Sequence, residues 1–272
     1  MAKIIRPKIC FALVTNREKS RYEYIRPMLN RLKRKLSDSF DIEIFECWGQ
    51  PKVVPHSLSI VLRKRFGNWV RSREWARYRE MKPRIIFLDL LVLIWRLALA
   101  IVNRKFEGRR NTIYSYITDK HIRAWMHFLE TEAHFLICFE DDVILKQDSV
   151  SRLEKLLNKI ESFSKKPIYI DLAGGCDLGE LMVENLESKR DGDYIYFKKP
   201  VTNTACCYII NRTTAEIFLF NLLKDPGLRR VSCDLLFNKL FVITSARKYF
   251  CCHANPTIFS HGSTTGKYPT LT

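Results

Sequence analysis

The sequence lacks the features that mark several common protein classes. Its nine cysteines include no CxxC pair, and most lie in apolar runs such as FLICFE and TACCYII. This pattern argues against a zinc ribbon and against a secreted disulfide framework. We therefore expect buried free thiols and a reducing, cytoplasmic compartment. We find no signal peptide, no internal repeat and no low-complexity segment.

An uninterrupted membrane-spanning run is also missing. The most apolar segment, residues 85–102, is interrupted by Asp89 and Arg96, and two charges at mid-depth disfavour a span. Basic and aromatic residues flank this segment on both sides, as they do at membrane-surface anchors. Two interpretations stay open, a buried helix of a globular domain and a helix lying in a membrane interface.

Acidic residues are scarce in the first 110 positions. This part carries 26 Lys and Arg against 10 Asp and Glu, whereas the remaining 162 residues carry 20 against 19. The formal charge of +17 favours an anionic partner. With 272 residues, of which 47% are hydrophobic, the chain can bury a sizeable core, and intrinsic disorder is excluded.

Apolar periodicity predicts an α/β fold. A strand over 8–14, a helix over about 19–36 and a strand over 41–48 form a β-α-β opening. Such an opening favours a mostly parallel sheet flanked by helices, with ligands beyond the carboxyl ends of the strands. Further helices are predicted at 118–133, around 153–160, at 213–223 and at 231–241, and Thr213 is the predicted cap of the third. Further strands are predicted at 134–139, 167–172, 193–199, 204–212 and near 250. The strands at 193–199 and 204–212 are predicted to pair with each other.

Three consecutive carboxylates follow the strand predicted at 134–139. Burying Glu140, Asp141 and Asp142 is costly unless a cation or hydrogen-bond donors compensate their charge. Because side chains alternate along a strand, Glu140 and Asp142 would face one site. Carboxylate oxygens suit Mg²⁺ or Mn²⁺, and such an ion can offset charge on a diphosphate. An acidic helix N-terminus is the alternative.

Other polar residues lie at predicted strand ends or in loops. Asn16 and Arg17 follow Thr15, where a guanidinium could pair with phosphate or remain solvated. Asp171 ends another strand, where it could contact a ligand or cap the following glycine turn. His261, in FSHGS, could offer a neutral imidazole to a metal or be an ordinary loop histidine.

Six segments in this order resemble those of a known family. They are Asn16-Arg17 after the first strand, Trp48-Gly49 after the second, DKHIRAW at 119–125, FEDDVIL at 139–145, CCYIINRTTAEIFL at 206–219 and Cys233-Asp234. Together they resemble glycosyltransferase family 25, which contains bacterial lipooligosaccharide galactosyltransferases and the collagen galactosyltransferases. The resemblance covers most of the chain outside 52–110. It implies a GT-A fold, a nucleotide-sugar donor, usually a UDP-sugar, and inversion at the anomeric carbon.

By this resemblance, Asp142 corresponds to the metal ligand of a DxD-like motif, and Asp234 corresponds to a general base, with a helix-capping aspartate as the alternative. His121 matches a Ser-His-x-x-x-Trp element in which Lys120 replaces the serine; a packing histidine is the alternative. With the strand-end residues above, the expected nucleotide-sugar site comprises Thr15, Asn16, Arg17, Trp48, His121, Glu140, Asp141 and Asp171, and the expected metal ligands are Asp142 and His261.

We therefore expect a single domain over 1–272 with a basic, apolar helical insertion at about 52–110. It would be a glycosyltransferase that uses Mn²⁺ or Mg²⁺ to modify a lipid-linked oligosaccharide or a surface polysaccharide, such as capsule or lipopolysaccharide. Residues 60–110 would hold it to an anionic membrane, on the cytoplasmic face of a bacterial inner membrane. The alternatives are an inactive scaffold and a metal-dependent nucleic-acid enzyme. No nucleic-acid partner is expected, because no zinc, RRM or helix-turn-helix signature accompanies the basic clusters.

Overall fold

The computed structural model describes residues 6–49, 66, 69–70, 73–74, 76–78, 86–102, 104–160, 166–175, 186–202 and 204–268. The strands are β1 (Lys8–Val14), β2 (Asp41–Cys47), β3 (Phe135–Glu140), β4 (Val143–Leu145), β5 (Ile168–Asp171), β6 (Ser188–Asp191), β7 (Tyr194–Phe197), β8 (Cys207–Asn211), β9 (Phe250–Ala254) and β10 (Phe259–His261). The helices are α1 (Lys19–Leu36), α3 (Ile86–Val102), α4 (Arg104–Glu130), α5 (Ser149–Ile160), α6 (Arg212–Lys224) and α7 (Cys233–Ile243), with a 3₁₀ helix η2 (Pro226–Arg230).

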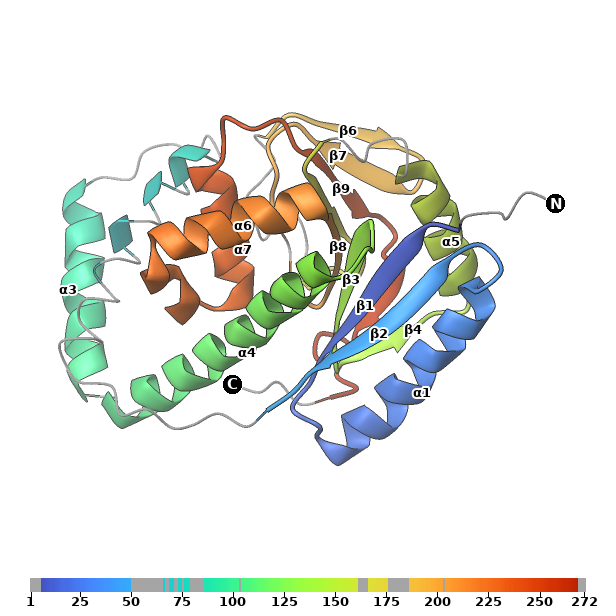
Figure 1. Cartoon of the computed structure of the whole chain (residues 1–272). Helices are drawn as coiled ribbons and strands as arrows, with labels where there is room; N and C mark the ends of the chain where they lie inside the picture. Colours follow the sequence, from blue (N-terminus) through green and yellow to red (C-terminus); the bar gives the residue numbers. More distant parts are fainter. Residues whose placement is uncertain are drawn as a thin grey trace.

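A large mixed sheet forms the centre of the described part of the chain, with helices on both faces (Figure 1). Its strand order is β2-β1-β3-β8-β5-β9-β7-β6. The pairings make β7 and β8 run opposite to the other six strands. The prediction of an α/β fold with a mostly parallel central sheet flanked by helices is therefore confirmed.

Alternation along the strands produces two cores. In β1, Cys10 and Ala12 face the core that contains Trp125 of α4, whereas Ile9 and Phe11 face the opposite core, against α1 and α5. The expectation of buried free thiols is confirmed for the eight cysteines in the described ranges.

The chain changes direction within the sheet at β1. From β1 it passes through α1 to β2 on one side, and then returns through α3 and α4 to β3 on the other side of β1. Both neighbours of β1 are parallel to it. In open α/β sheets, such a switch point leaves room for a ligand beyond the carboxyl ends of the two diverging strands. Here Thr15 follows the end of β1, and Glu140 is the last residue of β3.

The helix predicted at 118–133 is present, but its predicted start and one predicted strand pairing are wrong. The helix predicted at 118–133 begins at Arg104, so the end of the predicted insertion belongs to α4. Gly108 does not stop it, because a single glycine costs a helix only about 1 kcal/mol. The strands predicted at 193–199 and 204–212 are not partners: β7 pairs with β6 and β9, and β8 pairs with β3 and β5.

Much of the predicted insertion, including 50–65 and 79–85, lies outside the described residues. Its described helix, α3, lies at the edge of the molecule, away from the sheet (Figure 1). Within the described ranges, no helix has the length and apolar character needed to cross a membrane.

Asn211, rather than Thr213, caps α6. Its side-chain oxygen accepts from the Thr214 backbone N–H at 3.1 Å, and its amide nitrogen donates to the Lys166 carbonyl at 2.7 Å. The cap therefore also anchors the chain that leads into β5.

We expect Asn211→Ala to lower the free energy of unfolding by about 2 kcal/mol, because the helix cap and the bond to Lys166 are both lost. Thr213→Ala, the matched control, should change it by less than about 0.5 kcal/mol. Urea unfolding of both variants measures the difference. If both variants lose the same free energy of unfolding, the Asn211 side chain does not stabilise the helix as its cap.

Candidate active site

A cleft of about 200 Å³ opens at the switch point, beyond the carboxyl ends of β1 and β3. Its other walls come from α4 and from the C-terminal segment after β10. Six of the predicted site residues line it, namely Thr15, Asn16, Glu140, Asp141, Asp142 and His261. The structure thus brings together residues that are up to 246 positions apart in the sequence.

Asp141 ties the two strand ends together. Its Oδ2 accepts from the Thr15 hydroxyl and the Asn16 backbone N–H, each at 2.9 Å, and its Oδ1 pairs with Arg21 of α1 at 3.3 Å. Asp141 and Arg21 are both buried. Since its oxygens are already engaged by these donors, Asp141 shapes the cleft wall rather than offering a free carboxylate.

Asp142 is held by the C-terminal segment. His261 Nε2 lies 3.0 Å from its Oδ2, and the Ser263 hydroxyl donates to the same oxygen at 2.5 Å. Burial alone would raise the pKa of Asp142, but these hydrogen bonds and the charge of Arg21 lower it to about 2. Burial likewise opposes protonation of His261, yet the contact with Asp142 raises its pKa overall. The pair is therefore a carboxylate anion facing an imidazole that is protonated more readily than a free one.

A close backbone approach makes this contact possible. The Gly262 N–H donates to the Asp142 carbonyl at 2.8 Å, and β10 pairs with β4 directly after the acids. A Cβ at Gly262 would lie 2.6 Å from the Asp142 carbonyl oxygen and 2.5 Å from Tyr268. Only glycine fits this position without movement of the chain.

Asp142, Cys206 and His261 form a group whose possible ligand atoms all lie within 4.8 Å of one another. Burial raises the pKa of the Cys206 thiol well above its usual range, so it stays protonated and donates to Asp142 at 3.5 Å. A carboxylate oxygen and an imidazole nitrogen remain as ligands. That donor set fits Mn²⁺, which accepts both oxygen and nitrogen, better than it fits Mg²⁺.

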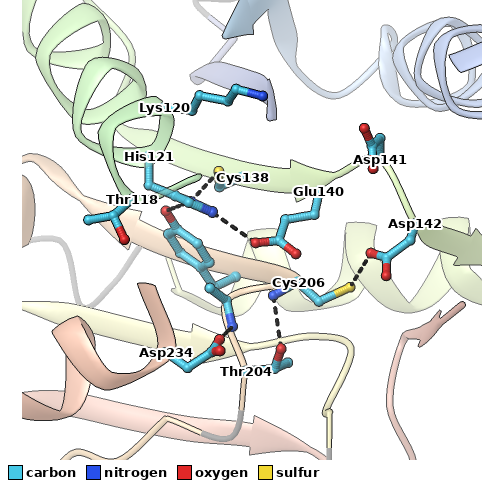
Figure 2. A network of polar contacts seen from close by, with 12 residues as sticks. Thr118, Lys120, His121, Cys138, Glu140, Asp141, Asp142, Thr204, Cys206 and Asp234 are labelled. Carbon is cyan, nitrogen blue, oxygen red and sulfur yellow. Dashed lines mark hydrogen bonds and ion pairs between the residues drawn. The ribbon is translucent and has the colours of Figure 1, made fainter. Parts of the chain in front are cut away.

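Behind the cleft, a buried chain of hydrogen bonds fixes Glu140 (Figure 2). Trp125 Nε1–H donates to the Tyr208 oxygen at 2.9 Å, which leaves the Tyr208 hydroxyl to donate to His121 Nδ1 at 2.9 Å. The His121 proton is thereby assigned to Nε2, which lies 3.0 Å from Glu140. Burial lowers the pKa of His121 to about 3, so the ring is neutral.

The charge of Asp234 acts on Glu140, and both carboxyl groups belong to the polar network of Figure 2. Burial and the charges of Asp142 and Asp234 raise the pKa of Glu140 well above its usual range. Asp234 begins α7 and accepts from the Ala205 backbone N–H at 2.7 Å through Oδ1. The Asp234 side chain is accessible to solvent, but the protein around it still desolvates the carboxylate, and this desolvation raises its pKa.

Five predicted residues lie outside the cleft lining: His121 and Asp234, described above, and Arg17, Trp48 and Asp171. Arg17 lies with its guanidinium 4.0 Å from the centre of the exposed Trp48 ring, at the neighbouring strand ends. Asp171 caps the glycine turn, as one alternative predicted, through bonds from the Ala173 and Gly174 backbone N–H groups to Oδ1. Its Oδ2 is buried with no hydrogen-bond partner in the described part of the chain.

Several site residues escape the sequence analysis. Lys120, noted there only as a replacement for serine, lines the cleft and donates to the Thr15 carbonyl and to Asn16 Oδ1. Burial lowers its pKa to about 8. Arg21 lies in no motif, and the motifs that contain Cys206, Tyr208 and Ser263 give these residues no role, because each acts through contacts between distant elements.

No protein-family model matches the chain, and no curated protein sequence matches it. Among solved structures, it is similar to the crystal structure of a glycosyltransferase involved in the glycosylation of the major capsid of PBCV-1. The TM-score is 0.41, with 6% sequence identity over 94% of this chain and 92% of that one. A similarity this remote assigns no activity to the chain. Any proposal of an activity therefore rests on the residues of the cleft.

We expect the His121 ring to stay neutral, with its proton on Nε2, from about pH 5 to 8. The ¹⁵N chemical shifts of the ring nitrogens measure this. Tyr208→Phe keeps the ring packing but removes the donor to Nδ1, so it should move the Nδ1 resonance. A ring that titrates near its ordinary value, or that carries its proton on Nδ1, would contradict the assigned network.

Proposed function

We propose that this chain is a metal-dependent, inverting glycosyltransferase of the GT-A type, related to family 25, that uses a nucleotide-sugar donor, with a UDP-sugar as the first candidate. The observation that carries the proposal is the cleft at the β1/β3 switch point. There, one carboxylate and one imidazole with ligand atoms 3.0 Å apart face the same space as buried basic side chains. A donor diphosphate needs both kinds of group.

The donor would lie along the strand ends. Asp142 and His261 would hold Mn²⁺ or Mg²⁺, which when bound neutralises charge on the diphosphate leaving group. Lys120 and Arg21 add fixed positive charge to the same wall. Thr15 and Asn16, held in place by Asp141, would contact the nucleotide. Trp48 and Arg17 form an exposed flat surface next to them.

Asp234 would act as the general base. It would take the proton of an acceptor hydroxyl; that oxygen would then bond to the anomeric carbon as the bond to the diphosphate oxygen breaks. Its raised pKa makes it a better proton acceptor at neutral pH. The Ala205 N–H orients one carboxylate oxygen and leaves the other for the acceptor. Asp171, with its unpartnered buried oxygen, would contact a sugar.

The acceptor would be a lipid-linked or surface glycan. The cleft is polar on the sheet side but carries Ile113, Tyr114 and Ile117 on the α4 side. An apolar wall of this kind suits an acceptor that carries a lipid, such as an intermediate of lipopolysaccharide or capsule assembly.

Product formation from a panel of nucleotide-sugars with Mn²⁺ or Mg²⁺ tests the proposal. Asp234→Asn should lower turnover by about 10²–10⁴-fold with little change in donor KM, because the asparagine oxygen can still accept from Ala205. Asp142→Asn should weaken donor binding as well as turnover. Asp148→Asn, an exposed acid outside the cleft, is the matched control and should match wild type.

If Asp234→Asn keeps turnover while Glu140→Gln loses it, the base is Glu140 instead. If the folded wild type turns over no nucleotide-sugar with either ion but cleaves DNA, the chain is a nuclease. If it does neither and binds no nucleotide, the chain is a scaffold. Either of the last two results contradicts the proposed function.

A further inference from the structure

The α3 helix exposes its apolar side chains instead of burying them. Eight large apolar residues of this 17-residue helix are exposed, and their exposed fractions range from 38% for Leu99 to 80% for Val102, with Trp95 at 62%. Only Leu93 is buried among its described side chains, and Leu97, one turn later, is partly buried. The alternative of a buried core helix is therefore wrong for the described part of α3.

The exposed residues are not scattered. At 100° per residue, those from Leu90 to Val102 cover roughly 200° of the helix circumference, and the face with Leu93 and Leu97 packs inward. A surface helix of a globular protein normally shows the opposite arrangement, with its apolar stripe turned to the core. A contiguous apolar patch of this kind marks a surface that contacts a membrane or another protein.

The charge around α3 favours a membrane. Residues 52–110 carry 15 Lys and Arg against 4 Asp and Glu, and four of these basic residues, Arg104, Lys105, Arg109 and Arg110, fall in the first two turns of α4. An apolar helix beside a cluster of basic residues is the composition of helices that lie in anionic interfaces. If the partner were an apolar protein surface, these basic residues would have no anionic groups to contact.

The same helix that follows α3 also forms the apolar wall of the cleft. Ile113 lies nine residues after Arg104, which is about 14 Å along α4. In Figure 1, α4 runs from the end of α3 to the sheet. A bilayer at α3 would therefore lie at the end of the cleft where a lipid-bearing acceptor would enter.

We infer that α3 lies in the interface of an anionic bilayer, with Leu91, Trp95 and Val102 on its immersed face, and that the basic sequence flanking α3 supplies the attraction to the anionic headgroups. On the cytoplasmic face of a bacterial membrane, this would place the cleft beside lipid-linked substrates. The link to the acceptor rests on the proposed function, but membrane binding itself does not.

Co-sedimentation of the full chain with phosphatidylcholine vesicles, with and without phosphatidylglycerol, tests this inference without any sugar donor. The wild type should bind only the vesicles that contain phosphatidylglycerol, and less at high salt. The triple variant Leu91→Gln, Trp95→Gln, Val102→Gln should lose at least about tenfold in partitioning. The matched control is Phe220→Gln, Leu223→Gln, which changes exposed apolar residues of α6 and should bind like wild type.

Thermal unfolding of each variant checks that it is folded, as is expected for exposed sites. The inference is overturned if folded wild type stays in the supernatant, if the α3 variant binds like wild type, or if the α6 variant loses as much binding. Light scattering without vesicles adds a last outcome: a dimer that the α3 variant abolishes would assign this face to a second copy of the chain. None of these results bears on transferase activity, which the turnover assay tests separately.

Discussion

Three consecutive carboxylates at the end of β3 require compensation, and each receives it from a different part of the chain. Asp141 is neutralised by the end of β1 and by Arg21 of α1. Asp142 is held by His261 and Ser263 of the C-terminal segment. Glu140 contacts the neutral His121 of α4 and keeps a raised pKa. Because a buried charge without partners costs several kcal/mol, these contacts fix where the three segments meet.

This division of partners separates structural from chemical roles. Asp141 has its donors already and builds the wall, whereas Asp142 and the facing His261 place an oxygen and a nitrogen that could serve as ligands next to each other. The Trp125–Tyr208–His121 chain orients Glu140, and burial keeps the pKa of His121 well below neutral and that of Tyr208 well above it. Preorganised groups of this kind do not need to rearrange when charge develops in a bound substrate. The cleft therefore offers a charged ligand polar groups that are already in place.

The sequence predicts the local features well and the long-range ones poorly. Periodicity places β1 and α1 at their observed bounds, and the acids after β3 are recognised as a site because their charge is unusual at the end of an apolar strand. His261 could be named only as one of two alternatives, because its meeting with Asp142 depends on β10–β4 pairing and on Gly262. Lys120, Tyr208 and Cys206 look like ordinary residues until the sheet order brings them together. The extent of α4 was missed because its first turns resemble a basic insertion rather than a core helix.

The most direct test of the central claim is a thermal-shift measurement of UDP, GDP, CMP and CDP forms of nucleotides and nucleotide-sugars, with and without Mn²⁺, on wild type and on Asp142→Ala. A ligand that binds only the native state raises its stability. The account predicts that one nucleotide class stabilises wild type, that Mn²⁺ is needed for this effect, and that Asp142→Ala abolishes it. A folded wild type that no nucleotide stabilises, or equal stabilisation of the variant, would contradict it.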